Sequence, residues 1–206
     1  MVDSKLATLY GIMLGDGCLS NSCNKYFISI SGSFYDDEPF FNKVVIPIFS
    51  KIRGKQTKYR KRPKQGKIEI NISDKKMFLY LKSLGFPVGR KLDRIFIPKI
   101  FYEKGLVKFV ISGVFATDGS LVITNNNGIP YPRLEITSKC LRFLNQIKNF
   151  LMENKMKGNV YRNNRKNGLI YRLEFPGKNN LEKFIELIGF INPKHVSKHN
   201  TFKCAF

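Results

Sequence analysis

An apolar run near the start of the chain reads LYGIMLGDG over residues 9–17, and an altered copy reads ISGVFATDG over residues 111–119. Leucine, methionine and alanine favour helix, and a glycine directly after such a run commonly ends one. Each copy therefore predicts a helix whose last residue is an aspartate, Asp16 in the first copy and Asp118 in the second.

Small residues recur at four-residue spacing in both copies, namely Gly11, Gly15, Gly113 and Thr117. Residues four apart lie on one face of a helix, and glycine inside a helix costs roughly 0.5–1 kcal/mol relative to alanine. Close approach of a second backbone is the usual reason for such a face. We expect the two helices to pack along these residues, which would bring the two carboxylates side by side.

The two copies belong to a longer internal repeat. Asp118 follows Asp16 by 102 positions, and Tyr161-Arg162 follows Tyr59-Arg60 at the same offset. Self-similarity of this length indicates a duplicated supersecondary unit. We predict an α+β fold of two pseudo-symmetric α-β-β-α-β-β-α halves that meet at the motif helices. The expected bounds are residues 1–86 for the first half, 87–102 for a basic linker and 103–206 for the second half.

Alternation of apolar and polar residues predicts antiparallel sheets with helices on one face and a polar, basic outer face. Several local expectations accompany this plan. Ser4 should cap the first helix, Pro47 should kink or break a helix that runs to about Ile52, and the second motif helix should begin near Glu103. A hairpin should turn at Asn167-Gly168.

The charge of the chain is unusual, since 36 Lys and Arg face 15 Asp and Glu, a net charge of +21 over 206 residues. This balance predicts a polyanionic partner, either nucleic acid or an anionic membrane surface. No apolar run approaches the length of a membrane-spanning helix and the N-terminus does not begin a signal peptide, so an intracellular protein is expected. The four cysteines are expected to be reduced thiols, and His195 and His199 to be solvated residues of the tail.

Outward residues of a four-stranded sheet can read base pairs in the DNA major groove, and basic side chains near hairpin tips can hold phosphates. The candidate DNA-binding residues are Arg60, Arg62, Asn71, Arg133, Arg162, Arg165 and Arg172.

Two carboxylates forced together repel each other unless a cation lies between them. Mg²⁺, or Mn²⁺ in its place, takes oxygen ligands and usually binds one or two carboxylates together with phosphate and water. A pair of such ions stabilises the attacking and leaving oxygens of a phosphodiester. Asp16 and Asp118 are therefore the candidate catalytic and metal-binding acids.

The two motifs resemble those of the LAGLIDADG homing endonucleases in their single-chain, two-motif form. Both copies keep the glycine at the third position, the apolar run, the acid at the eighth position and the closing glycine. The resemblance implies a monomeric, metal-dependent endodeoxyribonuclease that cuts both strands of a long DNA site and leaves 3′ overhangs.

The resemblance also implies that the carbonyl groups of Gly15 and Thr117 add metal ligands, and that a lysine lies near the metals. Lys139, at the end of the second strand of its half, is the candidate. The matching place in the first half, residues 31–33, has no lysine. That leaves a water-mediated contact or a group from the linker as alternatives there.

Two other functions remain open. Members of the same family act as RNA maturases for their host intron, and a basic protein of this kind can bind RNA or DNA without catalysis. A membrane-surface protein is a more distant alternative. Only the nuclease predicts that Asp16→Asn or Asp118→Asn abolishes activity while binding persists.

Overall fold

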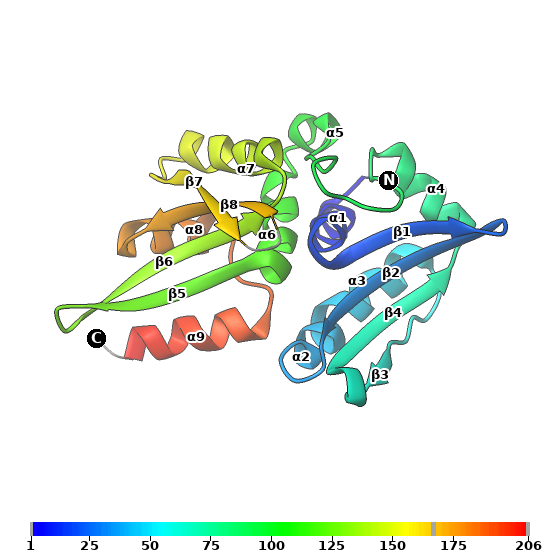
Figure 1. The fold of residues 1–206 in the computed structure, drawn as a ribbon, viewed down its shortest axis with the longest axis horizontal. Coiled ribbons are helices and arrows are strands. Elements are labelled where there is room, and N and C mark those ends of the chain that lie inside the picture. The colour runs from blue at the N-terminus through cyan, green and yellow to red at the C-terminus, as the bar shows by residue number, and fades with distance from the viewer. Residues whose placement is uncertain (1, 166–167, 205–206) are drawn as a thin grey trace.

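The computed structural model describes residues 2–165 and 168–204, which form two similar halves, each built on one four-stranded antiparallel sheet (Figure 1). The first half contains α1 (Ser4–Asp16), β1 (Gly17–Ser22), β2 (Lys25–Ser33), α2 (Glu38–Phe40), a π-helical turn (Phe41–Val45), α3 (Ile46–Arg53), β3 (Arg60–Arg62), a 3-10 turn (Pro63–Gln65), β4 (Lys67–Ser73) and α4 (Lys75–Ser83).

The second half contains α6 (Val107–Asp118), β5 (Gly119–Asn126), β6 (Ile129–Ser138), α7 (Leu141–Glu153), β7 (Asn159–Arg165), β8 (Gly168–Pro176), α8 (Lys178–Leu187) and α9 (Pro193–Cys204). The short helix α5 (Lys99–Glu103) precedes it. The predicted α+β architecture of two halves with paired motif helices is confirmed. Within the described residues, none of the helices has the length and apolar character needed to cross a bilayer.

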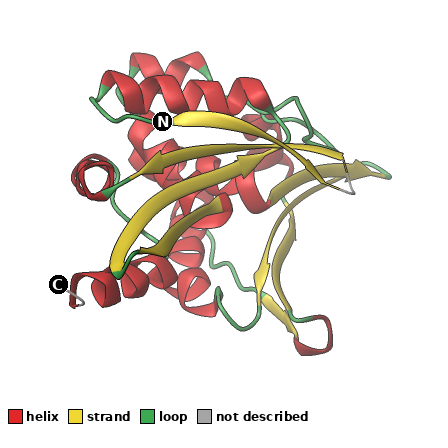
Figure 2. Ribbon diagram, turned by 60° about the vertical axis from the view of Figure 1, so that its left-hand side comes forward, coloured by secondary structure: helices red, strands yellow, loops and turns green. Residues whose placement is uncertain are grey.

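The two sheets have the same strand order, β1-β2-β4-β3 in the first and β5-β6-β8-β7 in the second. Buried residue pairs occupy corresponding places in the two sheets, because Ile30 pairs with Ile70 in one sheet and Ile136 pairs with Leu173 in the other. Helices gather on one side of the strands (Figure 2). The opposite faces of both sheets are left to polar side chains.

Helices α1 and α6 cross with their backbones in contact. A Cβ atom on Gly11 would lie 2.0 Å from the carbonyl oxygen of Val110, and one on Gly113 would lie 2.3 Å from the carbonyl oxygen of Thr8. A Cβ on Gly15 would lie 2.0 Å from Oγ1 of Thr117. The small residues of the two motifs therefore form the seam between the halves.

Both motif helices end at a glycine that leads directly into a strand. Gly17 and Gly119 have extended backbone, and a Cβ on Gly17 would lie 2.7 Å from the carbonyl oxygen of Met13. Only glycine allows the chain to leave the helix so sharply at this point. Asp16 and Asp118 are consequently the last helical residues of α1 and α6.

Two expectations about the first half need correction. Asp3, and not Ser4, caps α1, because its side chain accepts a hydrogen bond from the backbone N–H of Leu6 at 2.9 Å. The helix does not break at Pro47, because the π-helical turn before it changes the hydrogen-bonding pattern and Pro47 then lies in the first turn of α3. Proline is tolerated in the first turn of a helix, because the N–H group that it lacks would have no partner there.

Two expectations about the second half are also wrong. The second motif helix begins at Val107 and not near Glu103, because Gly105 has a left-handed backbone (φ +64°) that separates α5 from α6. The C-terminal segment is a helix, α9, in which His195 and His199 are buried. The hairpin expected at Asn167 lies outside the described residues.

Candidate metal and nucleic-acid site

The carboxylates of the two motifs lie where the seam helices end, but their environments differ. Asp118 is half-buried, and a Cβ on Gly15 would lie 3.3 Å from its carboxyl carbon. Burial, and then the neighbouring Asp16, raises the pKa of Asp118 to about 7. Asp16 is exposed at the mouth of the seam, yet its pKa is also raised, first by desolvation and then by Asp37. Because water still reaches Asp16, Asp118 is the more strongly perturbed acid of the pair.

A lysine from the linker completes this site. Nζ of Lys91 donates hydrogen bonds to the carbonyl oxygens of Leu14 at 2.8 Å and Met13 at 3.3 Å, and it also contacts that of Gly15. The last carbonyls of a helix lack partners within the helix and carry partial negative charge. Desolvation lowers the pKa of Lys91, while Asp118 and Asp16 oppose that effect. The linker therefore supplies a cation to the end of α1.

A cavity of about 320 Å³ opens beside these groups. Its lining includes Gly15, Lys91, Asp118, Thr137 and Lys139. The cavity thus brings the candidate lysine of the second half, which is exposed, together with one motif acid and with Lys91. The hydroxyl of Thr117 points back to its own helix and donates to the carbonyl oxygen of Val114 at 3.0 Å.

The donor set at the seam suits a hard divalent cation. It consists of two carboxylates and carbonyl oxygens that already hold one cation, the ammonium of Lys91. No cluster of three His, Cys, Asp or Glu side chains occurs in the part of the chain that the structure describes. Magnesium commonly binds with only one or two carboxylates and takes its other ligands from water and phosphate. The residues present therefore fit Mg²⁺ or Mn²⁺ better than a zinc site.

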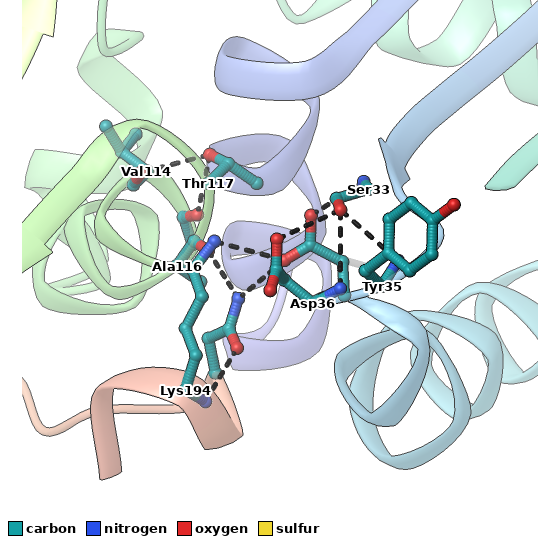
Figure 3. A network of polar contacts seen from close by, with 10 residues as sticks. Ser33, Tyr35, Asp36, Val114, Ala116, Thr117 and Lys194 are labelled. Carbon is teal, nitrogen blue, oxygen red and sulfur yellow. Dashed lines mark hydrogen bonds and ion pairs between the residues drawn. The ribbon is translucent and has the colours of Figure 1, made fainter. Parts of the chain in front are cut away.

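A second polar network lies at the end of α6 and joins three segments that are distant in sequence (Figure 3). The side-chain amide of Asn192, which is 1% exposed, donates to the carbonyl oxygen of Ala116 at 2.8 Å and to Oδ1 of Asp37 at 3.4 Å. Nζ of Lys194 also donates to that oxygen, at 3.0 Å. The network ties α9 to the first half and to the turn of α6 that carries Asp118.

The outer faces of the sheets hold arginines against glutamates that are buried (Glu69 and Glu174) or half-buried (Glu135). In the first sheet Arg62 pairs with Glu69 at 2.6 Å. In the second sheet Arg172 pairs with Glu174 and Arg133 pairs with Glu135. These contacts hold the arginine side chains in place on the faces that the sequence assigns to DNA.

Arg162 does not share that face. It pairs across the ladder with Tyr171, whereas its neighbour Tyr161 pairs with the outward Arg172. In the first sheet Arg60 pairs with Glu69, which is outward. The apparent match between Arg60 and Arg162 is therefore one residue out of register, and such a slip moves a side chain to the other face of a sheet. Asn71 lies opposite Ser29 on the outer face, and the side chain of Arg165 lies outside the described part of the chain.

Sequence reasoning missed four residues of this region, namely Lys91, Asp37, Asn192 and Lys194. They belong to connecting segments or to a polar helix, where no periodic pattern of apolar residues indicates which side chains lie close together in the fold. Only the basic character of the linker, and the lack of a lysine in residues 31–33, hinted at Lys91.

Known proteins share features of this sequence and fold. Residues 107–189 match the family model of the LAGLIDADG-like domain. Among solved structures, variants of the homing endonuclease I-DmoI align with a TM-score of 0.64 and 18% identity, over 90% of this chain and 95% of theirs. The I-LtrWI LAGLIDADG homing endonuclease bound to its target DNA aligns with a TM-score of 0.64 and 10% identity, over 98% of this chain and 90% of its own.

Curated relatives are much longer than this chain. The tRNA-splicing ligase RtcB of Methanopyrus kandleri is 24% identical in an alignment 207 residues long, which covers 90% of this chain and 20% of the ligase. The RtcB of Pyrococcus furiosus is 26% identical in an alignment 215 residues long, which covers 94% of this chain and 22% of the ligase. The chain spans about a fifth of these relatives. The resemblance seen in the two motifs is confirmed, because the chain has the fold of the single-chain, two-motif LAGLIDADG homing endonucleases and its residues 107–189 match the LAGLIDADG-like domain.

Proposed function

We propose that the protein is a sequence-specific endonuclease that hydrolyses both strands of a long DNA site and leaves 3′ overhangs. The observation that carries this proposal is the pair of aspartates at the ends of two helices whose backbones touch. One chain supplies both acids and both sheets, so the enzyme would act as a monomer, with residues 1–86 and 103–206 as its halves and 87–102 as the linker. Structures of I-DmoI with DNA and Mn support the proposal by analogy.

The residues of the seam have distinct tasks under this proposal. Asp16, Asp118 and the carbonyl groups of Gly15 and Thr117 would hold Mg²⁺ or Mn²⁺, which would stabilise the attacking and leaving oxygens of the phosphodiester. Lys139, exposed beside Asp118, would offset the charge of the reacting phosphate. The outward arginines of both sheets would hold the duplex across the seam.

The sharpest test is a cleavage selection. The protein is incubated with a plasmid library of candidate sites, in Mg²⁺ and in EDTA, and the DNA ends are sequenced. We expect discrete, metal-dependent double-strand breaks with staggered ends. Asp16→Asn and Asp118→Asn should bind the selected site with nearly unchanged affinity and leave it uncut. Both variants keep the size of the side chain and remove only the ionised carboxylate.

A bound site that stays intact in both Mg²⁺ and Mn²⁺ would reject the catalytic proposal. The assignment would then move to an RNA maturase or to a non-catalytic nucleic-acid-binding protein of this fold. Competition between the DNA site and structured RNA for the protein would separate those two.

A further inference from the structure

We propose that Lys91 competes with the divalent cation for the carbonyl oxygens at the end of α1, and that metal binding requires the ammonium group to leave them. This inference rests on the function proposed above, because it concerns the same metal site. It assigns a metal-gating role to a residue of the linker.

Lys91 occupies the carbonyl oxygens at the end of α1. The ammonium group of a lysine has three N–H donors, and Lys91 directs Nζ toward three consecutive carbonyl oxygens, those of Met13, Leu14 and Gly15. The carbonyl oxygen of Gly15, the residue before Asp16, contacts Lys91. The same oxygen is one of the expected metal ligands. A metal ion and an ammonium group cannot share one carbonyl oxygen at contact distance without strong repulsion between like charges.

The linker is held in place around Lys91 by backbone hydrogen bonds. The backbone N–H of Gly89 donates to the carbonyl oxygen of Leu19 at 2.7 Å, and Val88 forms a bridge with Leu19 of β1. On the other side, the N–H of Arg94 donates to the carbonyl oxygen of Lys91 at 2.8 Å. The side chain of Lys91 is therefore delivered to the seam by an anchored backbone.

A cavity next to Lys91 can take the displaced ammonium group. Lys91 lines the cavity of about 320 Å³ that Asp118 and Lys139 also line. After a cation takes the carbonyl oxygens, the tethered side chain can swing into this cavity, where a DNA phosphate would be its natural partner. Metal and DNA would then bind cooperatively, because each favours the same position of Lys91.

The test measures Mn²⁺ affinity without DNA, by electron paramagnetic resonance titration of free Mn²⁺. Lys91→Met removes the ammonium group but keeps an unbranched side chain. We expect it to bind Mn²⁺ about tenfold more tightly than the wild type, or better. Lys99→Met is the matched control, since it removes the same charge from an exposed side chain of the same region and should leave the affinity unchanged.

Lys91→Gln and Lys91→Arg keep the test decisive if Lys91→Met does not fold. The glutamine side chain can still donate to the carbonyl groups but has no charge, so Lys91→Gln should bind Mn²⁺ more tightly than the wild type. The arginine side chain keeps the charge, so Lys91→Arg should bind Mn²⁺ as weakly as the wild type does. Equal or weaker Mn²⁺ binding by the uncharged variants overturns the role of Lys91 and leaves the nuclease proposal intact. Absence of Mn²⁺ binding in every protein, wild type included, overturns both.

Discussion

At the scale of single residues, Asp118 is the motif acid whose ionisation the fold opposes more strongly. Its pKa of about 7 lies well above the usual value of an aspartate because water is displaced and Asp16 is near. A carboxyl group with a raised pKa in the folded state stabilises the protein fully only below its unfolded pKa, near pH 4. That stability is lost as the pH rises through 7.

Asp118→Asn should therefore stabilise the metal-free protein most at pH 8 and by a smaller amount at pH 5, where the folded protein still keeps this carboxyl group protonated. The neutral amide avoids the cost of a charged, desolvated carboxylate. The expected gain at pH 8 is roughly 1–3 kcal/mol, since each pKa unit corresponds to about 1.4 kcal/mol. Urea unfolding in EDTA at both pH values measures it. A difference between variant and wild type that does not change with pH would refute this account of Asp118.

At the scale of elements, the contact between α1 and α6 depends on the lack of side chains at its centre. Gly11 and Gly113 lie against the backbone of the opposite helix, so neither position has room for a methyl group. The four-residue spacing of small residues made this contact predictable from the sequence, because it depends on one simple steric rule.

Gly11→Ala should push the two helices apart and lower the free energy of unfolding by about 1–3 kcal/mol, the usual range for overpacking. The relative position of the two acids would change with the helices, so cleavage should fall further than DNA binding. Ser112→Ala on α6 is the control, because it removes a buried hydroxyl that has no hydrogen-bond partner and adds no atom. Equal stability of Gly11→Ala and wild type would show that the seam can relax.

The remaining elements show where sequence reasoning fails. The repeat suggested that Arg60 and Arg162 are equivalent. The pairing of β7 with β8 instead makes Tyr161 the counterpart of Arg60. The shift of one residue turns Arg162 to the other face of its sheet. His195 and His199 looked solvated because α9 is polar overall. They are buried because their rings pack on Phe115 and Phe190, which come from elsewhere in the second half.

At the scale of the whole molecule, the net charge of +21 should make DNA binding strongly dependent on salt. Six to ten phosphate contacts would lower the affinity about 10³- to 10⁵-fold between about 50 and 200 mM salt. Arg172→Gln should lower the slope of log K against log salt by about 1 if it holds a phosphate. Lys99→Gln, in the exposed linker region, should not change it. Fluorescence anisotropy at several salt concentrations measures both, and a flat salt dependence would speak against a nucleic-acid partner.

The network at Asp37 makes the surroundings of the two motif acids unequal. Lys91 lowers the pKa of both motif acids, but of the two only Asp16 has a pKa that Asp37 and Lys194 also influence. Lys194 comes from α9, and the first half has no helix in the corresponding place among the described residues. Under the proposed activity, the two scissile phosphates would meet different local fields. One strand would then be cut before the other, and a nicked duplex would accumulate for a time before the ends separate.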